Sequence, residues 1–215
     1  MPPRKGNRKH KKSLKLTKKS LKSMMKSVAY STQETLHHRV FGVDQAVPRV
    51  GYYEELNTVD QQGVQSGNFT GQEIRQMGLR LKGRLLQADS SNIVRWCVVT
   101  FTSAFQELLR DGTAEVNELF YEPSGALYSP MRECNIKKVY LDKTVVLNQQ
   151  DSENNKIVLF NEWIPLGFKK YKAIEAGPTT VDSGSDIIYI IALSDSSISP
   201  SPLVTYHSTL YYKDA

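Results

Sequence analysis

The feature that most constrains this chain is the separation of its charges. The first 26 residues carry eleven Lys or Arg and no Asp or Glu, whereas the remaining 189 carry seventeen basic and twenty-two acidic side chains. A segment that repels itself and buries little cannot offset its ordering entropy, so we expect it to stay mobile until a polyanion neutralises it. The chain therefore consists of a body with a net charge of −5 and a cationic arm suited to nucleic acid.

The cations of the arm are the predicted nucleic-acid-binding residues. They are Arg4, Lys5, Arg8, Lys9, Lys11, Lys12, Lys15, Lys18, Lys19, Lys22 and Lys26. Residues 1–10 contain Pro, Gly and charge and should be disordered. From Lys11 onward the spacing predicts an amphipathic helix, with a lysine stripe separate from the side that carries Leu14, Leu21, Met25 and Val28. Its serines are middling helix formers, so we expect a helix that is partly formed or induced by binding. The alternative is a solvated basic helix without a partner.

Length and composition narrow the class of the body. With the arm set aside, a chain of 215 residues leaves enough for one large all-β domain. No run approaches the roughly 20 apolar residues of a membrane-spanning helix, and the charged N-terminus lacks the apolar segment of a secretory signal. We expect no membrane partner. Cys97 and Cys134 are isolated in the sequence, which predicts a reducing compartment and no disulfide.

Strand patterns fill the body. Between residues 79 and 85, leucines alternate with Arg80, Lys82 and Arg84, which predicts a strand with one apolar and one basic face. Residues 93–102 are apolar on both sides, as expected of a central strand. The last predicted strand, residues 203–212, places four side chains on one face: Val204, Tyr206, Leu210 and Tyr212. Further strands are expected at residues 50–59, 137–147, 156–164 and 186–193.

One short helix is expected in the body. Residues 113–121 follow Asp111 and Gly112 and have apolar residues at helical spacing. Turn-forming residues separate the other predicted elements. Seven or eight strands with one helix predict an antiparallel sandwich or barrel with Greek-key wiring.

The sequence lacks the motifs of common enzymes. It has no nucleophile elbow, phosphate-binding loop, dinucleotide-binding glycine pattern or paired cysteines. His37 and His38 are adjacent and lack metal-ligand spacing, so we place them with Arg39 in a link between arm and body, solvated or facing phosphate. His207 and Ser208 are neighbours on a strand and face opposite sides of a sheet, which argues against a nucleophile and its base. We therefore expect no enzymatic activity.

With arm, helix and β body in this order, the chain resembles small single jelly-roll viral capsid proteins. It is most similar to the coat protein of satellite tobacco necrosis virus and to the related capsid proteins of circular Rep-encoding single-stranded DNA viruses. The resemblance follows a series of short segments in order along most of the chain, at residues 35–41, 66–67 leading into 74–75, 79–83, 137–148 and 211–215. The chain departs from the satellite virus pattern in its longer loops, at residues 122–131 and 194–202, and in its longer, lysine-rich arm.

The resemblance implies an all-β, eight-stranded antiparallel jelly roll of two packed four-stranded sheets, with a basic N-terminal arm and helix at residues 1–40 and a shell domain at residues 41–215. It implies a capsid protein of which about 60 copies form a T=1 icosahedral shell around a single-stranded DNA or RNA genome. The arms would hold that genome by counterion release, without reading its bases.

The resemblance also implies a location and a metal ligand. The protein is expected in the virion, after assembly in the host nucleus or cytoplasm, and the basic cluster at residues 4–12 fits either nuclear import or phosphate contact. One metal ligand is carried over, Asp214, for a cation such as Ca²⁺ between subunits. No other cofactor is expected.

A cellular nucleic-acid-binding β domain with a basic tail is the main alternative. In that case aromatic side chains should line an exposed sheet, where bases can stack on them. The candidates, which could equally pack between subunits, are Tyr52, Tyr53, Tyr206, Tyr211 and Tyr212. In a shell, Arg80, Lys82 and Arg84 could add to the inner surface or form a solvated strand face.

Overall fold

The computed structural model describes residues 18–32, 35–57, 73–88, 91–148, 156–172, 187–196 and 200–214. The chain divides into two compact units, Met1–Glu34 and Thr35–Ala215. The second unit begins with strand β1 (Thr35–Ala46), which contains His37, His38 and Arg39. The expectation that these three residues form a link was therefore wrong, because they pair with the last strand of the sheet.

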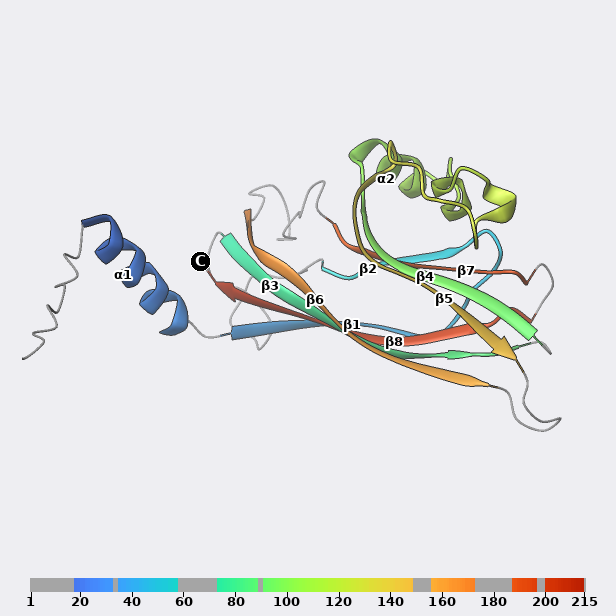
Figure 1. The fold of residues 1–215 in the computed structure, drawn as a ribbon, viewed down its shortest axis with the longest axis horizontal. Coiled ribbons are helices and arrows are strands. Elements are labelled where there is room, and N and C mark those ends of the chain that lie inside the picture. Colours follow the sequence, from blue (N-terminus) through green and yellow to red (C-terminus); the bar gives the residue numbers. More distant parts are fainter. Residues whose placement is uncertain are drawn as a thin grey trace, which may run out of the picture. The chain divides into compact units, whose positions relative to one another are not determined.

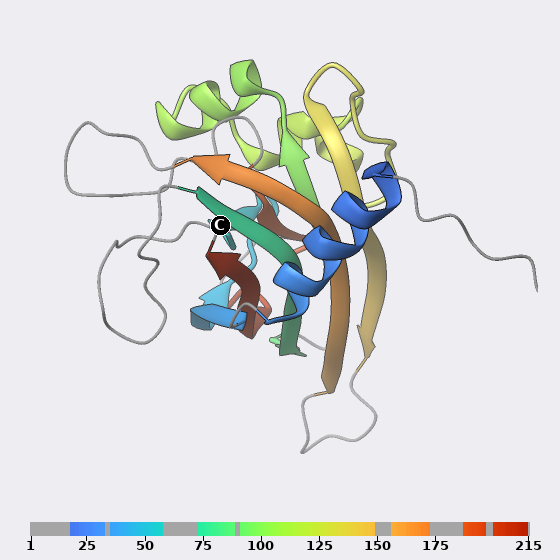
Figure 2. The same ribbon diagram turned by 90° about the vertical axis from the view of Figure 1, so that its left-hand side faces the viewer.

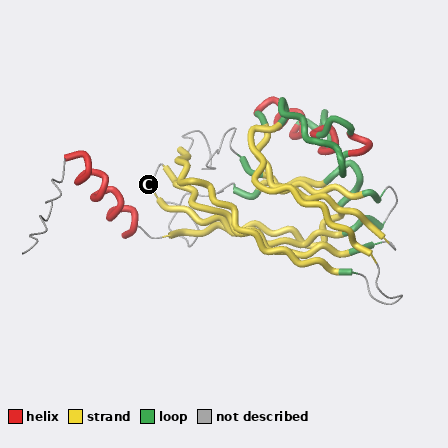
Figure 3. The backbone as a smooth tube through the Cα atoms, in the orientation of Figure 1, coloured by secondary structure: helices red, strands yellow, loops and turns green. Residues whose placement is uncertain are grey.

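The second unit is a sandwich of antiparallel sheets (Figures 1 and 3). The described residues form eight strands in two sheets of four. The first sheet has the order β1, β8 (Leu203–Asp214), β3 (Glu73–Leu86) and β6 (Ile157–Lys172). The second sheet has the order β2 (Tyr52–Glu55), β7 (Tyr189–Ser194), β4 (Ser91–Phe101) and β5 (Ile136–Asn148).

The strand order identifies the fold as a jelly roll. The first strand pairs with the eighth, the third with the sixth, the second with the seventh and the fourth with the fifth. Figure 2 shows β3 and β6 running side by side, although about 70 residues of chain separate them. This nested antiparallel pairing across two sheets confirms the predicted fold class.

The main core lies between the two sheets. The four residues predicted to share a face of β8 are buried there, with Val204 1% and Leu210 0% exposed. Leu79, Leu81 and Leu85 of β3 are also fully buried, while the basic residues between them are exposed, as the alternation predicts. Contacts join the layers directly. The Trp96 ring of β4 lies 4.5 Å from the Phe160 ring of β6, measured between centroids.

A second core covers the outer face of the second sheet. The connection between β4 and β5 contains α2 (Ser103–Arg110) and two 3₁₀ turns, η1 (Val116–Leu119) and η2 (Pro123–Gly125). Figure 1 shows this connection lying over β4 and β7. It buries Phe105, Leu119 and Phe120 against the outward side chains of the two strands. β4 and β7 are therefore apolar on both sides, which explains the pattern that predicted a central strand at residues 93–102.

The prediction of a helix at residues 113–121 was wrong. That segment contains only the turn η1, and the helix α2 precedes it. Gly112 has a φ of +68°, and its N–H donates to the carbonyl oxygen of Leu109 at 3.2 Å. Asp111 and Gly112 therefore end a helix, as glycine in the left-handed region commonly does, and do not begin one.

The described part of the first unit is the helix α1 (Lys18–Thr32). It matches the latter part of the predicted amphipathic helix, whose beginning at Lys11 lies outside the described residues. In the part of the chain that the structure describes, no helix is long and apolar enough to cross a membrane.

Candidate nucleic-acid interface

The arm cations are only partly described. Seven of the eleven predicted binding residues lie outside the described residues: Arg4, Lys5, Arg8, Lys9, Lys11, Lys12 and Lys15. Lys18 and Lys26 belong to α1, but their side chains are not described. Lys19 and Lys22 are exposed on the helix.

The helix α1 presents its apolar side chains to solvent. Leu21, Met25 and Val28 fall on one side of the helix and are 44%, 71% and 61% exposed. Lys22 lies about 100° around the helix axis from Leu21 and is exposed as well. The described helix is thus two-sided, with one apolar and one cationic side.

A second group of cations lies on the outer face of the first sheet. Arg80, Lys82 and Arg84 of β3 are all exposed. Arg80 Nε donates to Asn161 Oδ1 of the neighbouring β6 at 3.4 Å, and Arg84 forms an ion pair with Asp44 at 3.4 Å. These residues were predicted to share a basic face, and the structure places them together on one.

The predicted aromatic surface was partly wrong. Tyr206 and Tyr212 are 2% and 0% exposed and belong to the main core. Tyr206 also shares a hydroxyl contact of 3.1 Å with the half-buried Tyr52, across the two sheets. Burial raises the pKa of the Tyr206 hydroxyl above its ordinary value, so this group stays protonated. Of the three predicted tyrosines in the last strand, Tyr211 alone faces outward.

Two exposed aromatic residues were missed by the sequence analysis. Phe41 of β1 is 66% exposed and Trp163 of β6 is 55% exposed, both on the outer face of the first sheet. Trp163 lies between the polar pair Asn161 and Glu162 and the apolar pair Ile164 and Pro165, so the segment shows no period-two alternation that would indicate its direction. The useful signal was that Trp163 is an odd number of residues from Phe160, which belongs in the core.

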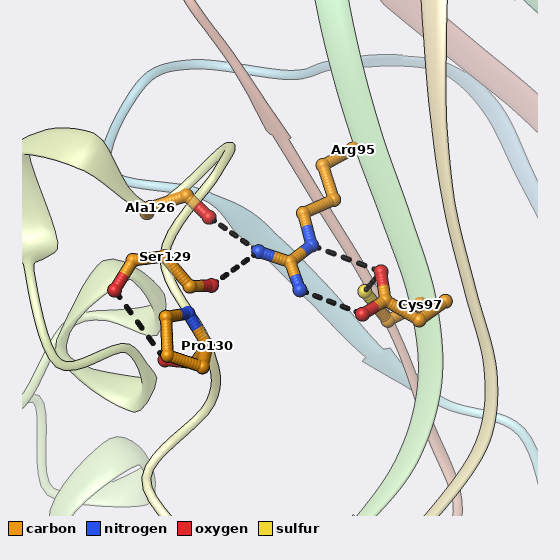
Figure 4. Close-up of polar contacts among 6 residues, drawn as sticks. Arg95, Cys97, Ala126, Ser129 and Pro130 are labelled. Carbon is orange, nitrogen blue, oxygen red and sulfur yellow. Dashed lines mark hydrogen bonds and ion pairs between the residues drawn. The ribbon is translucent and has the colours of Figure 1, made fainter.

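A buried arginine of the second sheet binds the connection that covers this sheet. Arg95 of β4 is 7% exposed and binds both carboxylate oxygens of Asp142 on β5, at 2.9 and 2.6 Å. Its Nη1 also donates to the carbonyl oxygens of Ala126 and Ser129, at 2.7 and 2.6 Å (Figure 4). The guanidinium carbon lies 4.6 Å from the centre of the Phe120 ring. Arg95 thus joins two strands to the connection that covers them.

The charges of this cluster are mutually stabilised. Burial alone would raise the pKa of Asp142, but hydrogen bonds from Arg95 and Cys97 and the charge of Arg95 lower it below its ordinary value. Burial, together with the Asp142 charge, raises the pKa of the Cys97 thiol well above the ordinary range. Cys97 and Cys134 are both free thiols, the first buried and the second exposed. The cluster therefore has a structural role and holds β4, β5 and the covering connection together.

The predicted metal ligand stays a prediction. Asp214 lies in β8, opposite Ile74 of β3 in the strand register, and its side chain is outside what the structure describes. Among described residues, no three His, Cys, Asp or Glu side chains gather in a way that could hold a metal ion.

Comparison with known proteins adds no relative. No model of a known protein family matches the sequence, and no curated protein matches it.

Proposed function

We propose that this protein is a viral capsid protein that assembles into a small T=1 icosahedral shell and packages a single-stranded genome through its basic N-terminal arm. The observation that carries the proposal is the combination of an eight-stranded jelly roll with a separate arm of eleven cations. The fold supplies a rigid wall element, and the chain after residue 26 has a net charge of −5. The arm supplies charge that one folded domain of this size does not need for its own stability.

Electrostatics supports a packaging role for the arm. In a shell of about 60 copies, arms of eleven charges bring roughly 660 positive charges into the cavity and release a comparable number of counterions from phosphate. Condensing the genome also relieves repulsion between arms, so genome binding and shell closure stabilise each other. No reading of bases is required. A Ca²⁺ ion at Asp214 between subunits is part of the same proposal.

Particle size and nuclease resistance test the proposal. The full chain, expressed alone and treated with nuclease, should sediment as a particle of about 1.5 MDa, from about 60 copies of 24.3 kDa, and should retain nucleic acid. Deletion of residues 1–26 should abolish packaging and leave cooperative melting of the β body unchanged. Loss of that melting on deletion would contradict the two-unit picture.

A cellular nucleic-acid-binding domain is the second candidate. The exposed aromatic residues of the first sheet favour it, because such residues stack on unpaired bases. A persistent monomer that binds free single strands, and never forms particles at any salt or protein concentration tried, would favour this candidate over the capsid.

A further inference from the structure

The outer face of the first sheet carries aromatic and cationic side chains that are exposed or half-buried. Six of these residues form what we call the basic–aromatic face: Phe41, Arg80, Lys82, Trp163, His207 and Tyr211. The residues come from all four strands of the sheet, β1, β3, β6 and β8. Their opposite neighbours on the same strands point into the main core, so the face is held by a rigid sheet.

One half of the face is built around Trp163. Its ring lies 5.6 Å from that of Tyr211, at 55° between planes. The indole covers Gly78 of β3, where an added Cβ would lie only 2.3 Å from indole Cζ2. Glycine inside a strand is unfavourable unless something approaches closely, and here the approaching group is this ring. Trp163 is therefore positioned against the sheet and is still 55% exposed.

The other half is built around Phe41. Its ring stacks on the His207 ring with centroids 5.8 Å apart and 28° between planes. His207 and Tyr211 are four residues apart on β8, so the two ring pairs lie roughly 13 Å from each other along the strand. A short stretch of single strand can reach both.

Cations stand next to each ring pair in the strand register. Lys82 is opposite His207, and Arg80 is opposite Trp163. Arg39 of β1 adds a further exposed cation on the same sheet. Among the described side chains of this face the carboxylate is Asp44, which already binds Arg84 and accepts a hydrogen bond from Thr205 at 2.8 Å. The face is therefore cationic, although the body as a whole has a net charge of −5.

We infer that the basic–aromatic face is a second binding surface for single-stranded nucleic acid, on which unpaired bases stack on Trp163 and Phe41 while Arg80 and Lys82 contact phosphates. Exposed rings between cations are the combination that binds single strands without sequence preference. A duplex keeps its bases stacked inside and cannot use the rings. The inference rests on the proposed function in one respect, since inside a shell a genome reaches this face only if the first sheet lines the cavity.

Tryptophan emission provides a direct test. The chain has two tryptophans, of which Trp96 is 2% exposed and Trp163 is 55% exposed, so quenching by a soluble ligand reports on Trp163. The probe is an oligothymidylate, added to full-length protein at concentrations where sedimentation shows unassembled subunits. Heparin, which has the charge but no bases, is the matched ligand control. Both should bind the arm, and only the oligothymidylate should quench the emission.

Amino-acid substitutions distinguish the contribution of the rings to binding from that of the charges. At raised salt, where arm binding is weak, Trp163→Leu should lower oligothymidylate affinity about tenfold. Arg80→Gln with Lys82→Gln should leave quenching in place and reduce the salt slope by about 1.4, the value for two contacts with a single strand. Tyr128→Leu, at a residue 73% exposed on the connection over the second sheet, is the matched control and should change neither quantity.

Three results would overturn the inference. They are quenching by heparin equal to that by oligothymidylate, unchanged affinity in both the Trp163 and the Arg80/Lys82 variants, or stronger quenching by polyglutamate, which would make the face a site for acidic protein. If these occur while the full chain still forms nuclease-resistant particles, the capsid proposal survives and the face is excluded. If quenching follows the expected pattern and particles never form, the face stands and the capsid proposal fails.

Discussion

The two sheets of this jelly roll differ in what lies on their outer faces. The second sheet is covered by the connection between β4 and β5, whose Phe105 and Phe120 pack against the sheet and are 3% and 0% exposed. The first sheet leaves Phe41 and Trp163 largely in solvent. Both outer faces carry large rings, and each also carries an arginine–aspartate pair.

The difference in exposure shows which of the two outer faces buries its apolar surface during folding. A ring buried on both sides contributes to stability through the area removed from water. A ring left exposed contributes little to stability and is available to a partner. The covered sheet is therefore the stabilising half of the sandwich, and the open sheet is the half suited to binding.

The largest expected effect is the loss of a covered ring. Phe120→Ala should lower the free energy of unfolding by about 4 kcal/mol, because it leaves a cavity beneath the connection and removes the ring that Arg95 contacts. Phe41→Ala, on the open sheet, should change it by less than about 1 kcal/mol. Chemical denaturation of both variants measures the difference. Equal effects would remove the distinction between the sheets.

The two arginine–aspartate pairs sharpen the comparison. Arg95→Ala should cost about 3 kcal/mol, because Asp142 and two carbonyl oxygens lose a buried partner. Arg84→Ala breaks the exposed pair with Asp44 and should cost less than about 1 kcal/mol. Urea midpoints at one pH provide the measurement. An Arg84 variant as unstable as the Arg95 variant would contradict the view of the open sheet as a solvated face.

A smaller effect on stability is expected from a substitution of Gly78, which lies beneath the exposed indole of Trp163. Gly78→Ala forces the Trp163 ring away from β3, at a cost of about 1 kcal/mol because a surface side chain can move. The fluorescence emission of Trp163 should shift to longer wavelength as the exposure of its indole increases. Gly125→Ala, where the added Cβ lies 3.3 Å from a Glu122 oxygen on the covered side, is the control and should leave the emission unchanged. An unshifted spectrum in Gly78→Ala would mean that the ring does not lie on the glycine.

The smallest expected effect is a loss of stability at acidic pH. The folded-state pKa of Asp142 is lowered, so the stabilisation from this carboxylate is complete above its ordinary pKa of about 3.9 and is lost as the pH falls through the folded value. The difference in unfolding free energy between the wild type and Asp142→Asn should therefore narrow as the pH falls below that ordinary pKa. A difference that stays constant down to the pH of acid unfolding would show that Asp142 does not titrate with folding.

Most of the strand pattern could be predicted from sequence, because one-sided burial imposes a period of two. On β8 the alternation of Val204, Tyr206, Leu210 and Tyr212 identified the inner face correctly. On β1 it failed. His38 occupies an inward position of this edge strand, so the segment looked polar and was assigned to a link. Edge strands are less constrained by the core than central ones.

The covered and open faces could not be predicted, because they depend on where one connection folds back. Val116 and Leu119 were expected on a helix, yet they are buried through a 3₁₀ turn whose approach to β4 and β7 leaves no local signature. Likewise, Trp163 and Tyr211 are 48 residues apart, and only the positions of β6 and β8 on either side of β3 bring their rings together. The arm, in contrast, was evident from charge alone.

The pairing of β1 with β8 has a consequence for biosynthesis. β1 is synthesised more than 150 residues before β8, its neighbour among the described strands, and β8 also has to insert between β1 and β3. A nascent chain on the ribosome can form the β4–β5 and β3–β6 pairs, but it cannot complete the first sheet until residues 203–214 have emerged. Closure of the sandwich is therefore a late step that follows the synthesis of residues 203–214, as expected for a topology dominated by distant contacts.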